Sequence, residues 1–150
     1  MLRWFVLLPC LIAATACAAF ETPESLLSEI YAQYGLSAAS AGKACVSDAK
    51  GFDFTGKKAG NFIEPTLLKA LKNDKELYGD PFIEGQDFCL KDLQIKALDS
   101  GADKAKIEVQ FQNFDRKTKL IYEMIRTPKG WLIRDLIGTD GALRKSYKLK

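Results

Sequence analysis

The chain has 150 residues, of which 47% are apolar and 27% charged, and its formal net charge is +3. It contains no histidine, which excludes Ser-His-Asp triads, Cys-His dyads, histidine-based zinc sites and histidine pH switches. Positions 1–19 hold 16 of the apolar residues, and the other 131 positions hold 55, about 42%, which is ordinary for one soluble domain.

The first nineteen residues have the pattern of a secretory signal peptide. A basic start at Arg3 precedes an apolar run over 4–14, and small residues fill 15–19. A membrane anchor is the alternative, but crossing a bilayer takes about 20 apolar residues, and this run is shorter and interrupted by Pro9. The pattern therefore predicts an exported, periplasmic protein.

Cleavage of this leader after Ala18 or Ala19 fits the small-residue rule and leaves a single domain over 20–150. A lipoprotein anchored through Cys17 is the alternative, although the residues before Cys17 lack the bulky apolar residue that opens a lipobox. No apolar run after the leader has the length of a transmembrane segment.

Two cysteines, Cys45 and Cys89, remain in the mature chain. An even pair in an exported protein favours one disulfide, which would close a loop of about 44 residues. Two buried free thiols are the alternative. The sequence has no Cys-x-x-Cys motif, so an oxidoreductase is not expected.

Two helices are expected in the first half of the chain. Thr22 and Pro23 are typical of a helix start, and apolar residues then recur at helical spacing, which predicts a helix over 23–34. The second helix begins at Pro65, and its apolar face continues less regularly to Leu77 and Tyr78 before Gly79 ends it.

The segment 36–61 between these helices has no periodicity. A loop of this length is uncommon in a compact domain unless it is functional or tied down. We expect Val46, Phe52 and Phe54 to insert into the core, with Cys45 anchoring the segment.

From residue 88 the apolar period changes to two. Alternating segments at 93–97 and 105–112 are followed by strand-like segments at 117–127 and 131–137, all separated by short turns. Short turns favour antiparallel neighbours, so we expect a four-stranded meander whose apolar face is covered by the two helices. A short basic helix or tail, 142–150, completes an α+β fold.

Two short motifs frame this expected sheet. Residues 130–136 read GWLIRDL, while residues 78–82 and 85–87 read YGDPF and GQD. The first is similar to the last strand of the nuclear-transport-factor-two-like superfamily, the cystatin-like cone fold. The others look like the central signature of a family of small exported bacterial proteins of unknown function. The resemblance implies a cone of helices on a curved sheet, but this superfamily hosts enzymes, carriers, adaptors and inhibitors, so it implies no single activity.

Asp80, Gln86 and Asp87 lie where the second helix hands over to the sheet, at the expected mouth of a cone. They are candidates for ligand binding or for acid–base chemistry, because burial can raise the pKa of a carboxyl group. The alternative, which we favour, is that their side chains cap turns by accepting or donating hydrogen bonds locally.

Four aromatic residues with polar tips are candidates to line a pocket: Tyr31, Tyr34, Tyr122 and Trp131. Tyr31 and Tyr34 share the apolar face of the first helix, however, and this favours a place in the core.

Arg134 and Asp135 follow each other on the last strand, so only one of them should face the helices. An inward Asp135 would need a partner, for which Arg126 and Tyr122 are candidates. A structural ion pair is the interpretation that we favour over a binding role.

The C-terminal basic residues form a last candidate surface: Arg144, Lys145, Lys148 and Lys150. Weak contact with an anionic membrane surface and a simply solvated tail are both open, whereas export argues against nucleic acid.

No metal, nucleotide or serine-hydrolase motif is present, so we expect no cofactor. The absence of a catalytic constellation favours a non-catalytic binding or interaction module for a protein or a small molecule. The alternatives are a small enzyme using Asp80, Asp87 or Asp135 with Tyr122, and a periplasmic immunity-type inhibitor. A monomer and a dimer are both open.

Overall fold

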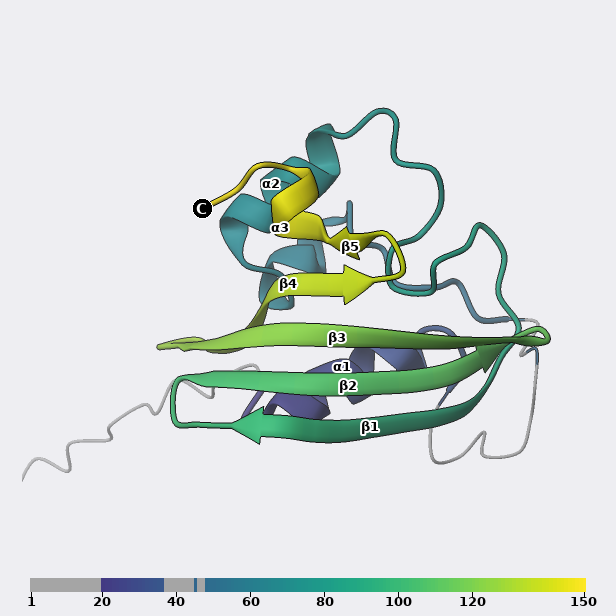
Figure 1. Ribbon diagram of the computed structural model, residues 1–150, viewed down its shortest axis with the longest axis horizontal. Helices are drawn as coiled ribbons and strands as arrows, with labels where there is room; N and C mark the ends of the chain where they lie inside the picture. Colours follow the sequence, from purple (N-terminus) through teal and green to yellow (C-terminus); the bar gives the residue numbers. More distant parts are fainter. Residues whose placement is uncertain (1–19, 37–44, 46–47) are drawn as a thin grey trace, which may run out of the picture.

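The structure is a computed structural model and describes residues 20–36, 45 and 48–150. The expected leader, Cys17 and Val46 lie outside these residues. The described part is an α+β fold in which an antiparallel sheet, in the order β1-β2-β3-β4-β5, is packed against helices (Figure 1). None of its helices combines the length and apolar character needed to cross a membrane.

The sheet follows the predicted meander. Its strands are β1 (Leu90–Ser100), β2 (Lys104–Asn113), β3 (Arg116–Thr127), β4 (Gly130–Gly138) and β5 (Gly141–Ala142). The expectation of four strands missed β5, which is too short for periodicity to indicate. Alternating burial along β2 and β3 places apolar side chains on the helix-covered face and polar ones on the other.

Ion pairs and a hydrogen bond join polar side chains on the face of the sheet away from the helices. Lys106 forms an ion pair with Glu123 at 3.2 Å, and Lys119 forms another with Glu108 at 3.8 Å. Gln110 donates to Glu108 at 2.6 Å. These contacts are largely exposed, so they contribute little to stability.

Helix α1 (Pro23–Ala32) begins at a capping box formed by Thr22 and Ser25, and its apolar side is fully buried against the sheet. It ends two residues before the predicted boundary, and Tyr34 lies in the turn that follows. A turn closed by Gly35, with φ +86°, explains the earlier end because glycine adopts this conformation without strain.

Helix α2 (Pro65–Asn73) is shorter than predicted. The Asp74 carboxylate accepts a hydrogen bond from the Glu76 N–H at 2.8 Å, and the backbone of Asp74 is extended, which ends the helix. The prediction that Tyr78 continues the apolar face is wrong, because its side chain is 86% exposed.

The segment between the helices is held by its aromatic side chains and by a disulfide. Phe52 is buried, Phe54 packs against the core, and a short 3-10 helix, η2 (Lys57–Asn61), leads to α2. The predicted disulfide joins Cys45 to Cys89, whose Cα atoms are 4.2 Å apart. It therefore ties this segment to the start of β1, as expected.

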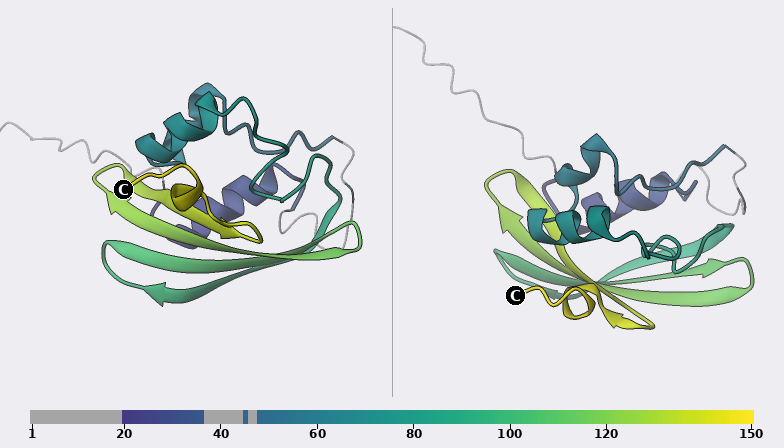
Figure 2. Two further views of the ribbon diagram at one scale, coloured as in Figure 1. Left: turned by 45° about the horizontal axis from the view of Figure 1, so that its top comes forward. Right: turned by 90° about the horizontal axis from the view of Figure 1, so that it is seen from above.

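Large side chains fill the space between the sheet and the helices. The ring of Phe82 lies 4.9 Å from that of Phe52 and 6.3 Å from that of Tyr122, and Tyr31 packs against Phe111 at 5.4 Å. Figure 2 shows α1 and α2 over one side of the curved sheet. The concave side is therefore a packed aromatic core.

A β-bulge in β4 decides which way its polar residues point. Glu123 pairs with Asp135 and Met124 with Ile133, so Arg134 is the extra residue. Cross-strand partners share a face, which places Asp135 with Glu123, away from α1.

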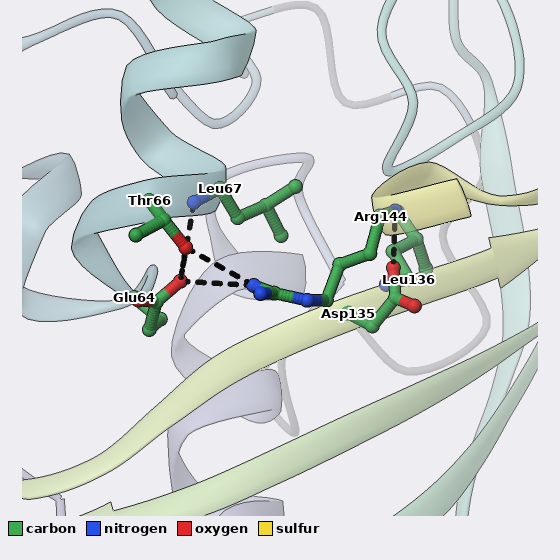
Figure 3. A network of polar contacts seen from close by, with 6 residues as sticks. All are labelled: Glu64, Thr66, Leu67, Asp135, Leu136 and Arg144. Carbon is green, nitrogen blue, oxygen red and sulfur yellow. Dashed lines mark hydrogen bonds and ion pairs between the residues drawn. The ribbon is translucent and has the colours of Figure 1, made fainter. Parts of the chain in front are cut away.

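The C-terminal helix α3 (Leu143–Ser146) is clamped to the rest of the fold (Figure 3). Asp135 accepts hydrogen bonds from the N–H groups of Leu136 and Arg144, both at 2.9 Å. The proposal of Arg126 or Tyr122 as partner of Asp135 is therefore wrong, because the backbone provides the donors. The Arg144 guanidinium reaches Glu64 at 3.2 Å and the Thr66 hydroxyl at 3.1 Å, at the start of α2.

Candidate functional site

A groove of about 430 Å³ lies beside the turn that connects α2 to β1. One wall comes from this turn and the other from the end of β4 and its connection to α3. The lining residues are Leu77, Tyr78, Gly79, Asp80, Pro81, Glu84, Gly85, Gln86, Arg116, Leu136, Gly138, Thr139, Asp140, Gly141 and Leu143. This volume lies within the range of small-ligand sites.

Asp80 organises the first wall. Its backbone N–H donates to the Gly85 carbonyl at 2.7 Å, and its carboxylate accepts hydrogen bonds from the Phe82 N–H at 2.8 Å and from the Tyr34 hydroxyl. Gly79, with φ +96°, permits this closure, since a Cβ there would lie 2.9 Å from the Gly85 carbonyl oxygen. These hydrogen bonds are those of a turn-capping residue, which is the role that the sequence favours for Asp80.

Glu84 joins the two walls. Its carboxylate accepts hydrogen bonds from the backbone N–H and the hydroxyl of Thr139, the latter at 2.9 Å. The absence of a side chain at Gly138 makes room for it, because a Cβ there would overlap the carboxylate. Arg116 donates to the Glu84 carbonyl, so this cation is held at the rim. The groove is thus braced from one wall to the other.

Two core tyrosines support the turn from below. The Tyr31 hydroxyl donates to the Phe82 carbonyl at 3.0 Å and shares a 2.9 Å hydrogen bond with the Tyr122 hydroxyl. Burial raises the pKa of Tyr31 and of Tyr122, so both hydroxyls are neutral. Both side chains are fully buried and are absent from the groove lining.

The Asp80 carboxyl group at the groove binds its proton more tightly than an ordinary aspartate. Burial raises the pKa of Asp80 to about 6, against hydrogen bonds from Tyr34 and Phe82 that lower it. Burial and the adjacent Asp80 also raise the pKa of Tyr34, so its hydroxyl stays a donor. A carboxyl with this pKa can exchange a proton near neutral pH, although both of its oxygens already hold protein donors.

The raised pKa of Asp80 predicts a pH dependence of stability. In the unfolded chain this carboxyl has a pKa of about 3.9. The folded state therefore binds more protons between about pH 4 and pH 6, and the free energy of unfolding should fall by about 2–3 kcal/mol as the pH rises through this window. Asp80→Asn should lack this loss. Urea unfolding of both proteins from pH 4 to 8 measures it, and parallel curves for the two would contradict the assignment.

Of the other sequence candidates, Gln86 lines the groove, and the rest lie outside it. Gln86 is exposed at the groove, while Asp87 is exposed beside it and uses its carbonyl to accept from Asn113. Trp131 is buried and donates its indole N–H to the Glu21 carbonyl. Arg134 is half-buried at the bulge, and its side chain forms no hydrogen bond or ion pair with another described residue.

Several lining residues were missed by sequence reasoning. Glu84, Arg116 and Thr139 come from three separate segments, and none belongs to a motif. For Tyr78 the sequence does contain an indication that it lies outside the helix. It directly precedes Gly79-Asp80-Pro81, a turn sequence that a helix does not continue through. Across the part of the chain that the structure describes, no group of three or more acidic or cysteine side chains has the geometry to hold a metal ion.

Comparison with known proteins gives little. No protein-family model matches the sequence, and no curated protein matches it. Among solved structures, a phospholipid-binding protein from Ralstonia solanacearum in complex with a phospholipid is similar at 12% sequence identity and a TM-score of 0.34. The match covers 89% of this chain and 76% of that chain. This is a distant likeness of fold, and no family assignment follows from it.

Proposed function

We propose that this protein is an exported, non-catalytic binding module of the cell envelope and that the groove is its ligand site. The observation that carries the proposal is a braced groove of about 430 Å³ with Tyr78 at its edge, 86% exposed. Exposed aromatic side chains beside a pocket are typical of binding sites.

The free polar groups of the groove define the ligand that it would take. The Tyr78 hydroxyl, the Gln86 amide and the Asp140 carboxylate have no hydrogen-bond partner among the described residues, and Arg116 keeps guanidinium N–H groups beyond the one on Glu84. Leucine side chains and Pro81 supply apolar surface. A small ligand with a carboxylate, an ammonium group and apolar side chains, such as a short peptide, matches this lining.

Titration of the 15N-labelled protein with leucyl-leucine, followed by NMR, tests the proposal. We expect chemical shift changes at groove residues, and none of comparable size with N-acetyl-leucine amide, which lacks both charges. Tyr78→Ala combined with Arg116→Gln should weaken binding about tenfold or more. Phe114→Ala is the matched control, because this side chain is also exposed but lies outside the groove lining. Absence of any shift at millimolar dipeptide would overturn the assignment of the ligand.

A second candidate function is acid–base catalysis by Asp80, favoured by its pKa of about 6 at the groove. It takes second place because Tyr34 and Phe82 already donate to both oxygens. A general base of this kind should exchange the α protons of a ketone such as cyclohexanone with D2O, and Asp80→Asn should abolish the exchange. An immunity-type inhibitor, with a toxin domain bound at the same groove, is the third candidate.

A further inference from the structure

The charges of this protein are strongly segregated. Residues 56–75 and 141–150 carry nine Lys and Arg against two acids, a net charge of +7. The other 120 residues carry 13 cations against 17 acids, a net charge of −4. The overall charge of +3 therefore conceals one strongly basic region.

The two halves of the basic region meet in the fold. Arg144 contacts Glu64 and Thr66 at the start of α2, and the Tyr147 hydroxyl donates to Asp74 at its end at 2.8 Å. η2 joins them, because the Lys72 ammonium donates to the Gly56 carbonyl at 3.2 Å. Figure 1 shows α2 and α3 together at the β4–β5 end of the sheet. We call this the basic η2/α2/α3 surface.

The two acids of the basic region are engaged in contacts within the fold, and the Asp53 carboxylate just outside it interacts electrostatically with Lys72. Glu64 accepts from Arg144, Thr66 and the Leu67 N–H, and Asp74 accepts from Tyr147 and Glu76. All lysines of the surface are exposed, and none forms an ion pair with another described residue. These lysines are Lys57, Lys58, Lys69, Lys72, Lys75, Lys145, Lys148 and Lys150. Arg144 was predicted as part of the basic tail, but its side chain forms an ion pair with Glu64 and is only 12% exposed.

An apolar hollow opens among these lysines. It measures about 330 Å³ and is lined by Gly60, Ile63, Pro65, Leu68, Lys69, Lys72 and Asn73. Nucleic-acid surfaces combine cations with aromatic side chains that stack on bases, and this hollow has no aromatic lining residue. Ammonium groups around apolar side chains instead match an anionic headgroup layer above hydrocarbon.

We propose that the basic η2/α2/α3 surface docks on the surface of a membrane rich in anionic phospholipid. The lysines contact the headgroups and the hollow accepts apolar atoms beneath them. Gly141 and Leu143 of this surface line the groove, but none of its lysines does. Docking through the lysines therefore requires neither occupation of the groove nor the function proposed for it.

Co-sedimentation with vesicles tests this. Vesicles of phosphatidylcholine with about 30% phosphatidylglycerol should bind the protein at about 0.1 M salt, and vesicles of phosphatidylcholine alone should not. Lys57→Gln/Lys69→Gln/Lys145→Gln, with one change in each element, should lower the partition coefficient about 100-fold, since each lysine near such a surface contributes a factor of about five. Thermal melting checks that the variant remains folded.

The matched control is Lys96→Gln/Lys104→Gln/Lys117→Gln, which removes the same charge from exposed lysines of the sheet. It should change vesicle binding by less than about threefold. Equal losses in the two triple variants, or equal binding to neutral vesicles, would show non-specific charge or no lipid preference and overturn the proposal. Tighter binding to a single-stranded oligonucleotide than to anionic vesicles, lost in the same variant, would assign the surface to nucleic acid instead.

Discussion

Replacement of Phe82 by alanine is expected to destabilise the protein by about 3–5 kcal/mol, the range found when a buried phenylalanine is truncated. Phe82 is 1% exposed and packs its ring against Phe52, Phe54 and Tyr122. Its backbone also carries the hydrogen bonds to Tyr31 and Asp80 that hold the groove wall. Urea unfolding monitored by circular dichroism measures the change.

The same substitution should also affect the groove. Loss of the ring frees the turn that carries Asp80, so dipeptide-induced shifts at the groove should weaken even under conditions where the variant is folded. Phe114→Ala serves as the control because Phe114 is 53% exposed, and we expect a change in stability below about 0.5 kcal/mol. A variant Phe82→Ala with the unfolding midpoint of the natural sequence would disprove the central place of Phe82 in the core.

Removal of the disulfide should cost about 4 kcal/mol. Cys45 and Cys89 are 44 residues apart, and the chain-entropy model gives this value for a loop of that length. Cys45→Ser combined with Cys89→Ala suits the exposure of Cys45 and the burial of Cys89. The free energy of unfolding of this variant, measured beside the oxidised natural sequence, gives the difference.

Reducing agent provides the control for this second prediction. Dithiothreitol should lower the stability of the natural sequence to about that of the double variant and leave the variant itself unchanged. If reduction leaves the unfolding curve of the natural sequence in place, the link between the segment at Cys45 and β1 contributes nothing. If it also alters the variant, the effect lies elsewhere.

Most of the fold could be read from local patterns. The capping sequence at Thr22 placed the start of α1, proline placed the start of α2, and period-two alternation placed β2 to within a residue. The pairing of the two cysteines followed from their number. Errors of fold fell at the helix ends and at the short strand β5. Asp74, for example, accepts a backbone hydrogen bond that ends α2 early.

The candidate site was less predictable because contacts between distant segments form it. Asp80 and Gln86 were singled out from their turn sequence, and both line the groove. The groove also contains Glu84 from the turn, Arg116 from the start of β3 and Thr139 from just after the end of β4. Only hydrogen bonds between these distant segments bring them together. Tyr31 was expected at the core or at a pocket, and Tyr122 at a pocket. Both are fully buried in the core.

The sequence by itself excluded histidine chemistry and predicted the α+β class and the disulfide pair. Each of these depends only on composition or on short-range periodicity. Only the tertiary structure decided that the pKa of Asp80 is raised and that Arg144 is held in an ion pair. The pKa of Asp80 is raised because the fold buries its carboxyl group, and the charge of Arg144 is paired because β4 brings this residue to Glu64. Desolvation and charge pairing act through space, so a one-dimensional pattern does not contain them.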